Sequence, residues 1–213
     1  MALGAGSVTP MQMATAYAVF ANGGYRVRPW LITRVSEQRG KVLLEASSPP
    51  RTESDTAIEP RNAFMMSSLL QEVTRSGTAA RAQATLKRPD IYGKTGTTND
   101  SMDAWFAGYQ PTLAAVTWIG YDTPRKLGDK ETGGGLSLPV WISFMETALK
   151  NVPVKEPEPP EGVVHINNEW YYEEFAKGSG IGAVGGEKNG AAPAPRSTTS
   201  AEEQRSILDL FRN

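Results

Sequence analysis

The stretch that organises the chain reads Ile-Tyr-Gly-Lys-Thr-Gly-Thr-Thr-Asn-Asp and occupies residues 91–100. A lysine, two hydroxyl groups and a glycine fall within Lys94-Thr95-Gly96-Thr97, at the end of a short extended run. Side chains alternate along a strand, so Lys94 and Gly96 share one face and the threonines take the other unless a bulge re-aims one. The cation and hydroxyls could hold a carboxylate, and a free main-chain N–H could face a developing oxyanion. The stretch therefore predicts an anion-binding strand at a sheet edge, where Gly96 allows a ligand to approach closely.

Lys-Thr-Gly is also the third signature element of the serine acyl-transferases that include β-lactamases and penicillin-binding proteins. By itself the triplet is better explained as an exposed strand end followed by a tight turn. The flanking segments favour the functional interpretation, because their order resembles the transpeptidase domain of class A penicillin-binding proteins from Leu3 to about Asn151. The segments that carry this resemblance are Gly4-Ala5-Gly6-Ser7-Val8-Thr9-Pro10, Asn22-Gly23-Gly24-Tyr25, Arg75-Ser76-Gly77-Thr78-Ala79, Asp103-Ala104-Trp105-Phe106-Ala107-Gly108-Tyr109 and Glu131-Thr132-Gly133-Gly134-Gly135.

The resemblance implies a role for each residue of the central motif. Lys94 would support proton transfer and the electrostatics around a nucleophilic serine. The hydroxyls of Thr95 and Thr97 would hold the terminal carboxylate of the substrate or of a β-lactam, and the Thr97 N–H would form half of the oxyanion hole. Gly96 and Thr98 would line the same substrate edge. The implied partners are peptidoglycan stem peptides ending in D-Ala-D-Ala, β-lactams, and the upstream half of the same domain.

Two motifs of the resembled family are missing from the 213 residues. No serine has a lysine three positions on, and no Ser-x-Asn occurs. Thr97-Thr98-Asn99 has similar spacing but directly follows the third motif, so it cannot take that part. We therefore expect a segment of a peptidoglycan D,D-transpeptidase that lies downstream of the serine and is inactive alone. The alternatives are a non-catalytic remnant that binds cell-wall partners, and a fragment of a β-lactamase or D,D-carboxypeptidase.

Composition and hydropathy argue against several other kinds of site and of protein. The net charge of −1 gives no electrostatic footprint for nucleic acid. The chain has no cysteine and one histidine, His165, so disulfides, thiolate sites and multi-histidine metal centres are excluded, and we expect no cofactor. No apolar run reaches the length of a membrane span, and the N-terminus lacks a signal-peptide pattern. By resemblance the protein would work at the periplasmic face of the bacterial inner membrane, attached only through an anchor upstream of this segment.

Periodicity predicts an α+β fold, the C-terminal part of a β-lactamase/transpeptidase-like fold. We expect an antiparallel sheet of strands at about 91–98, 104–109 and 113–120, the last two buried on both faces, with a helix at 138–150 packed on one face. That helix would bury Trp141, Phe144, Met145 and Ala148. Two further helices are predicted, one from a Thr9 cap to residue 21 and one at about 60–76, which would bury Ala63, Met66, Leu70 and Val73. Residues 25–44 are predicted as a hairpin and 78–90 as a loop.

Composition also divides the chain into three parts. Residues 1–152 would form the C-terminal part of the transpeptidase domain, and 153–162 a solvated linker rich in proline and glutamate. Residues 163–213 would be a mostly disordered tail, with one small strand within 165–175 and a short helix carrying Ile207, Leu208 and Phe211. By resemblance, the strand at 113–120 would pair with an upstream strand and would otherwise present an aggregation-prone edge.

Overall fold

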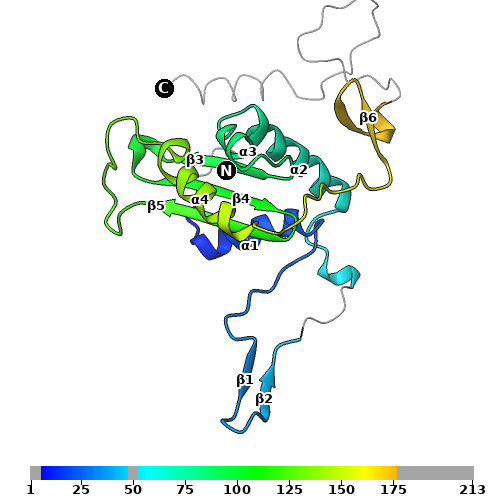
Figure 1. The fold of residues 1–213 in the computed structure, drawn as a ribbon. Coiled ribbons are helices and arrows are strands. Elements are labelled where there is room, and N and C mark those ends of the chain that lie inside the picture. The colour runs from blue at the N-terminus through cyan, green and yellow to red at the C-terminus, as the bar shows by residue number, and fades with distance from the viewer. Residues whose placement is uncertain (1–5, 48–51, 177–213) are drawn as a thin grey trace, which may run out of the picture. The chain divides into compact units, whose positions relative to one another are not determined.

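The computed structural model describes residues 6–47 and 52–176 (Figure 1). Its centre is an antiparallel sheet of three strands in the order β3-β4-β5, formed by Tyr92–Thr97, Ala104–Gln110 and Leu113–Ile119. Lys94 pairs with Ala107, and Ala107 pairs with Val116, so these three residues share one face. The predicted sheet is confirmed. Burial is less complete than expected, because every residue of β5 is only half-buried.

Two helices lie on opposite faces of this sheet, α1 at Pro10–Ala21 and α4 at Leu138–Ala148 (Figure 1). The Tyr17 ring of α1 lies 6.4 Å from the ring of Tyr109, which projects from the Lys94 face. Trp141 of α4 contacts Phe106 on the other face, with ring centroids 4.9 Å apart. The α1 cap has the predicted form, in which Thr9 and Gln12 exchange hydrogen bonds.

The buried stripe of α4 differs from the predicted stripe. Phe144 is 52% exposed, because the buried stripe of the helix lies to one side of it. That stripe packs with Phe106 and Ile91 in the main core, and its members are Leu138, Trp141, Ile142, Met145 and Leu149. The helix is also preceded by a π-helical turn at Gly133–Ser137. Trp141 and Met145 are therefore buried as predicted, Ala148 is half-buried, and Phe144 is not in the core.

Helix α2 spans Pro60–Arg75, as predicted, but buries polar residues that the apolar pattern did not indicate. Its buried residues are Ala63, Ser67, Leu70 and Thr74. Met66, predicted to be in the core, is 39% exposed. Ser67 Oγ bonds to the Ala63 carbonyl and the Tyr109 hydroxyl, and Thr74 Oγ1 donates to the carbonyl of Ile91. These hydrogen bonds remove the cost of burying the two hydroxyls.

Two segments around α2 correct the sequence predictions. Residues 81–86 form helix α3, Arg81–Leu86, inside the stretch predicted to be a loop, and Lys87 ends it in the left-handed region at φ 52°. The predicted hairpin at 25–44 is much shorter, with β1 at Arg34–Ser36 paired to β2 at Val42–Glu45. Tyr25 forms only an isolated bridge to Thr56, beside the short helix η1 at Glu53–Asp55.

The chain after α4 is more ordered than predicted. Residues 153–160 form no regular secondary structure, but they are held: the Lys155 N–H donates to Asp90, and Gln71 donates to Glu156. Strands β6 (Val163–Ile166) and β7 (Glu169–Tyr172) then form a hairpin, followed by α5 at Glu173–Ala176. In place of the one small strand expected within 165–175, residues 163–176 thus form a hairpin and a short helix, and the predicted helix carrying Ile207, Leu208 and Phe211 lies outside the described residues.

The hairpin packs on α2 through side chains of both segments. The Trp170 ring meets Phe64 edge-on at 4.9 Å, Arg61 forms an ion pair with Glu174 at 2.9 Å, and the Tyr172 hydroxyl donates to Asn62. Within the part of the chain that the structure describes, no helix is long and apolar enough to cross a bilayer.

Candidate functional site

Strand β3 passes from the core to the surface along its length. Ile91, Tyr92 and Gly93 are buried, whereas Lys94 and Thr97 are exposed. Gly93 allows this passage, because a Cβ there would lie 2.6 Å from the Phe106 ring and 2.8 Å from the Ala107 carbonyl oxygen. Among the described residues, β3 pairs only with β4, so its other side is a free sheet edge. The Lys-Thr-Gly residues thus lie where the sequence placed them, at the exposed end of an edge strand.

The Lys94 ammonium lies along this edge, beside Thr95. Its Nζ atom donates to the Thr95 carbonyl oxygen at 3.0 Å and to the Thr95 hydroxyl oxygen at 3.3 Å. The side chains alternate as predicted, because Lys94 borders the α1 face while Thr95 and Thr97 contact segments on the α4 face. The long Lys94 side chain nevertheless reaches the Thr95 hydroxyl, so a cation and a hydroxyl lie together at this edge.

The two threonine hydroxyls of β3 are each engaged by a segment from elsewhere in the chain. Thr95 Oγ1 lies 2.9 Å from the hydroxyl of Thr78, in the turn between α2 and α3. Thr97 Oγ1 accepts a hydrogen bond from the Gly133 N–H at 3.1 Å. The sequence prediction did not include Thr78 or Gly133 among the site residues. Both belong to segments that carry the family resemblance, and this resemblance is the sequence signal that could have identified them as site residues.

Gly133 is required by the close approach of the π-helical turn η3 (Gly133–Ser137) to the sheet. A Cβ atom at this position would collide with the carbonyl oxygens of Trp105 and Gly96. Only a residue without a side chain can bring its N–H to Thr97 along this path. The turn therefore fixes the orientation of the Thr97 hydroxyl.

Thr98 lies beside these residues but has a different local partner. Its hydroxyl oxygen accepts from the Asp103 N–H at 2.7 Å, and its own N–H donates to the Asp103 carbonyl oxygen at 3.1 Å. These bonds close the turn that contains helix η2 (Asn99–Ser101), where Asp100 and Ser101 have positive φ values. Thr98 therefore shapes the turn that follows the strand, as well as bordering the site.

A hollow of about 740 Å³ lies along the α1 face of β3. Lys94 is the only cation among the described residues that line it, and Asp103 and Asp122 are its acidic groups. Tyr17 of α1 also lines it, and burial raises the pKa of that phenol further above neutral pH. The hollow thus holds the positive charge of Lys94, two carboxyl groups and otherwise uncharged residues.

Part of that wall is aromatic, which the sequence prediction did not assign to the site. Trp105 and Trp118 are cross-strand partners with ring centroids 6.0 Å apart. The Trp118 indole N–H donates to the Asp103 carboxylate at 2.8 Å, which holds the ring in place. Both tryptophans have the same strand parity as Lys94, so the register could have placed them on its face.

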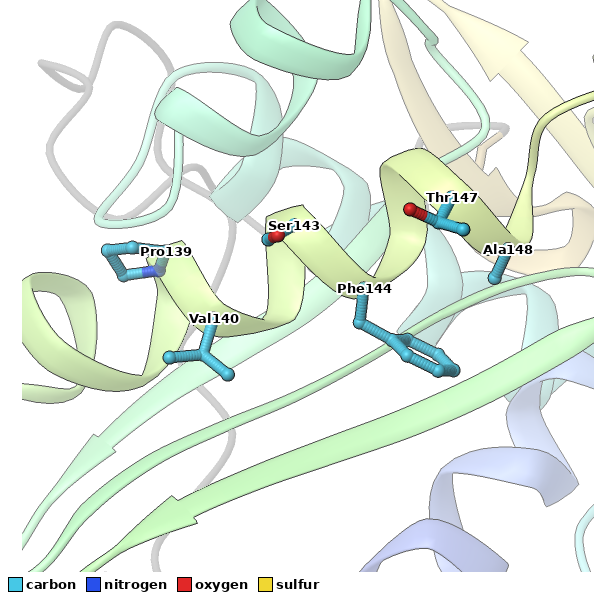
Figure 2. A pocket seen from close by; sticks show the side chains of 6 residues that line it. All are labelled: Pro139, Val140, Ser143, Phe144, Thr147 and Ala148. Carbon is cyan, nitrogen blue, oxygen red and sulfur yellow. The ribbon is translucent and has the colours of Figure 1, made fainter.

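A second hollow, of about 820 Å³, lies over the outer face of α4 and is shown in Figure 2. Pro139, Val140, Phe144 and Ala148 provide most of its lining, with only the hydroxyls of Ser143 and Thr147 as polar side chains. It contains no ionisable group that could transfer a proton. The hollow beside β3 is therefore the candidate functional site. In the described parts of the chain, no group of three or more His, Cys, Asp or Glu residues could hold a metal ion.

Comparison with known proteins identifies the family of the chain. Residues 1–146 match the family described as the penicillin binding protein transpeptidase domain, which covers more than half of the chain. The chain belongs to this family of transpeptidase domains.

Within the family it is similar to penicillin-binding protein 1A. It is 44% identical over 199 residues to the protein of that name from Neisseria lactamica, covering 92% of this chain and 24% of the relative. The solved structure of penicillin-binding protein 1A from Haemophilus influenzae matches with a TM-score of 0.72 and 32% identity, over 80% of this chain and 33% of that one. The Mycobacterium tuberculosis PonA1 protein in complex with penicillin V matches with a TM-score of 0.58 and 26% identity, over 71% and 41%. The chain thus spans about a quarter of the length of the curated relatives it matches.

Proposed function

We propose that this chain forms the Lys-Thr-Gly wall of a serine-type peptidoglycan D,D-transpeptidase that also binds penicillin. The observation that carries the proposal is the exposed edge of β3, where the Lys94 ammonium lies 3.3 Å from the Thr95 hydroxyl beside a hollow of about 740 Å³. Membership of the transpeptidase family supports it, as does the penicillin V complex of the similar PonA1 protein. As in that family, the setting would be the periplasmic face of the inner membrane.

The proposed reaction joins two peptidoglycan stem peptides in two steps. A serine oxygen, supplied from outside this chain, adds to the carbonyl carbon of the penultimate D-alanine. The C–N bond to the terminal D-alanine breaks, and that residue leaves with a proton on its nitrogen. The amine of a second stem peptide then attacks the ester, a C–N bond forms, and the serine regains its proton. A β-lactam stops at the first step because its leaving nitrogen stays attached.

Each residue of the β3 edge has a defined part in this proposal. Lys94 stabilises negative charge near the serine and takes part in its proton transfer. The hydroxyls of Thr95 and Thr97 donate to the terminal carboxylate, and Gly96 leaves room for the peptide backbone beside the strand. The Thr97 N–H faces the developing oxyanion, together with the N–H of the serine. Thr98 holds the turn that closes this edge.

The test uses covalent labelling with fluorescent penicillin. The 213-residue chain, which has no Ser-x-x-Lys, should form no adduct that survives denaturing electrophoresis. A chimera in which residues 6–151 replace the matching segment of Neisseria lactamica penicillin-binding protein 1A should be labelled. In that chimera Lys94→Ala should slow acylation at least ~100-fold, the usual scale of a lost proton-transfer group. Thr97→Ala should slow it only ~10-fold, because the main-chain N–H remains.

The matched control is Lys150→Ala, which removes an exposed lysine just after α4, away from the lining of the β3 hollow. It should acylate at the wild-type rate. Equal rates for the wild-type and Lys94→Ala chimeras would remove Lys94 from the mechanism. A chimera that folds but is never labelled would favour the non-catalytic alternative. Labelling followed by rapid release of hydrolysed penicillin would favour a β-lactamase.

A further inference from the structure

We propose that Thr78 is a positioning residue for carboxylate recognition: its hydroxyl orients Thr95 so that the Thr95 proton points to the ligand. The inference rests on the proposed function and adds a residue from a different segment to the β3 edge. The direct observation is the contact of 2.9 Å between the hydroxyl oxygens of Thr78 and Thr95.

The position of Thr78 is fixed by the residues on each side of it. Ala79 is fully buried, and its N–H donates to the Val73 carbonyl oxygen at 3.1 Å. Gly77 is packed so closely on α2 that a Cβ there would lie 2.8 Å from Val73 Cα. Thr78 itself is exposed, so water could satisfy its hydroxyl and the fold does not need the contact with Thr95. A rigid turn therefore presents an otherwise free hydroxyl to the edge strand.

The side chain of Thr95 lies between two other segments. Its hydroxyl contacts that of Thr78, and its methyl group is directed toward Gly134 of the η3 turn, since a Cβ built on Gly134 would lie 3.8 Å from the methyl carbon. The same Cβ would lie 3.4 Å from the carbonyl oxygen of Thr78, so the two threonines and Gly134 meet at one corner. A β-branched side chain has few allowed rotamers, and in this one the methyl faces η3 while the hydroxyl faces Thr78.

Hydrogen-bond direction then decides what Thr95 can offer a ligand. A threonine hydroxyl has one proton and two acceptor sites, whereas a lysine ammonium can only donate. Lys94 Nζ lies 3.3 Å from Thr95 Oγ1, so it occupies one acceptor site. When Thr78 donates to the second site, the Thr95 proton has no internal acceptor in this cluster. It is then free to be donated to an anion at the strand edge.

The hydroxyl proton of Thr97 is also available to a ligand, but here a main-chain group supplies the hydrogen bond. Its oxygen accepts the Gly133 N–H at 3.1 Å, which leaves its own proton available. Thr95 and Thr97 are two residues apart on one face of a strand, a spacing of ~6.7 Å between their Cα atoms. One carboxylate can accept from both, one bond of ~2.6 Å at each oxygen. Thr78 and Gly133 thus prepare a pair of donors that matches a carboxylate better than a neutral ester or amide.

The experiment measures discrimination between a carboxylate and its neutral analogue in the chimera described above. Second-order acylation rates are compared for benzylpenicillin and for benzylpenicillin methyl ester. Thr78→Val keeps the shape of the side chain and removes the hydroxyl. It should lower the ratio of acid to ester rates ~5- to 10-fold, the scale of one hydrogen bond to a charged group. Thr78→Ser should restore the wild-type ratio.

The control is Thr147→Val, the same change at an exposed threonine on the outer face of α4. It should leave the ratio unchanged, and urea unfolding of all three variants should show an unchanged midpoint. A Thr78→Val ratio equal to wild type would overturn this inference but not the proposed function, provided that Lys94→Ala still slows acylation at least ~100-fold. Equal slowing with acid and ester would also overturn it, because the residue would then act only on the general shape of the site. A wild-type chimera that is never acylated would overturn both proposals.

Discussion

Asp90, two residues before strand β3, is a charged residue with no exposed surface. Arg88 donates to both of its carboxylate oxygens, at 2.9 and 2.7 Å. The side chain of Gln110 and the N–H of Lys155 also donate to it, at 3.1 and 3.0 Å. Burial acts to raise the pKa of Asp90, but these hydrogen bonds outweigh it and hold the pKa below its usual range. The charge is therefore part of the packing between β3, β4 and the segment after α4.

Replacing Asp90 by Asn should destabilise the protein in a pH-dependent way. A depressed pKa contributes stability that is present above the unfolded-state value of about 3.9 and lost as the pH falls through the folded-state pKa. Asp90→Asn should lower the free energy of unfolding by about 3 kcal/mol at pH 7, because Arg88 loses its buried partner. The difference from wild type should shrink as the pH is lowered from 5 to 2, as followed by urea unfolding.

Asp100→Asn is the matched control, because Asp100 forms only an exposed pair with Lys126, at 3.6 Å. It should change stability by less than ~0.5 kcal/mol. If Asp90→Asn lost the same stability at pH 3 as at pH 7, the charge of Asp90 would not be the stabilising feature.

At the residue scale, the sequence predicted the local part of the site and missed the rest. Lys94, Thr95, Gly96 and Thr97 are contiguous, so one motif identifies them. Thr78 and Gly133 lie 17 and 36 positions away from their partners. Their roles depend on packing that no local pattern encodes. The buried hydroxyls of α2 were missed for a similar reason, since their acceptors are main-chain and side-chain groups contributed in part by other elements.

At the scale of elements, the long periodic segments were predictable and the short ones were not. Helices α1, α2 and α4 and the three central strands were found from their spacing and caps. Helix α3 has six residues and no side-chain cap, so it lacks the start signal that identifies a helix. The β6–β7 hairpin is ordered by its contact with α2. Its own four-residue strands predict little, since a two-stranded hairpin is only marginally stable alone.

The contact between this hairpin and α2 can be measured by a double-mutant cycle. Phe64→Ala and Trp170→Ala should each destabilise the protein, and the two losses should not add, because their rings pack edge-on at 4.9 Å. We expect a coupling energy of about 1 kcal/mol, typical of an aromatic pair. Urea unfolding of wild type, both single variants and the double variant gives this value.

Phe64→Ala combined with Trp30→Ala is the control cycle, because Trp30 is exposed in a loop. Its coupling should be zero within ~0.3 kcal/mol. A zero coupling for Phe64 and Trp170 as well would show that the hairpin does not pack on α2 in solution.

At the scale of the whole molecule, the outer edge of β5 is a site where the protein could associate with another chain. Within the described residues β5 pairs with β4 alone. Its sequence, Leu113–Ile119, is Leu-Ala-Ala-Val-Thr-Trp-Ile, uncharged and rich in residues that favour strands. Such an edge can pair with another chain. The pairing of this strand with an upstream strand, which the family resemblance implies, stays a prediction.

We expect the 213-residue chain alone to self-associate through β5. Size-exclusion chromatography with light scattering should show a mass that rises with concentration. Thr117→Lys, which places a charge on this edge strand, should reduce the association. Ser143→Lys adds the same charge on the exposed face of α4 and should have a smaller effect. A monomer of constant mass with slow amide exchange along 113–119 would contradict the prediction, and so would equal effects of the two lysines.

The attachments of the segment after α4 also determine how the molecule would respond to mechanical force. A pull applied beyond Ala176 acts first on α2, through the Arg61–Glu174 ion pair and the Phe64–Trp170 contact. Only after these contacts rupture does tension reach Lys155, whose N–H is bound to Asp90 at the start of β3. The contacts of the hairpin and α5 with α2 thus carry a C-terminal load before Lys155 does. A surface tether or fusion partner attached after residue 176 would pull on α2 first, and on the Lys155–Asp90 hydrogen bond only after the hairpin detaches.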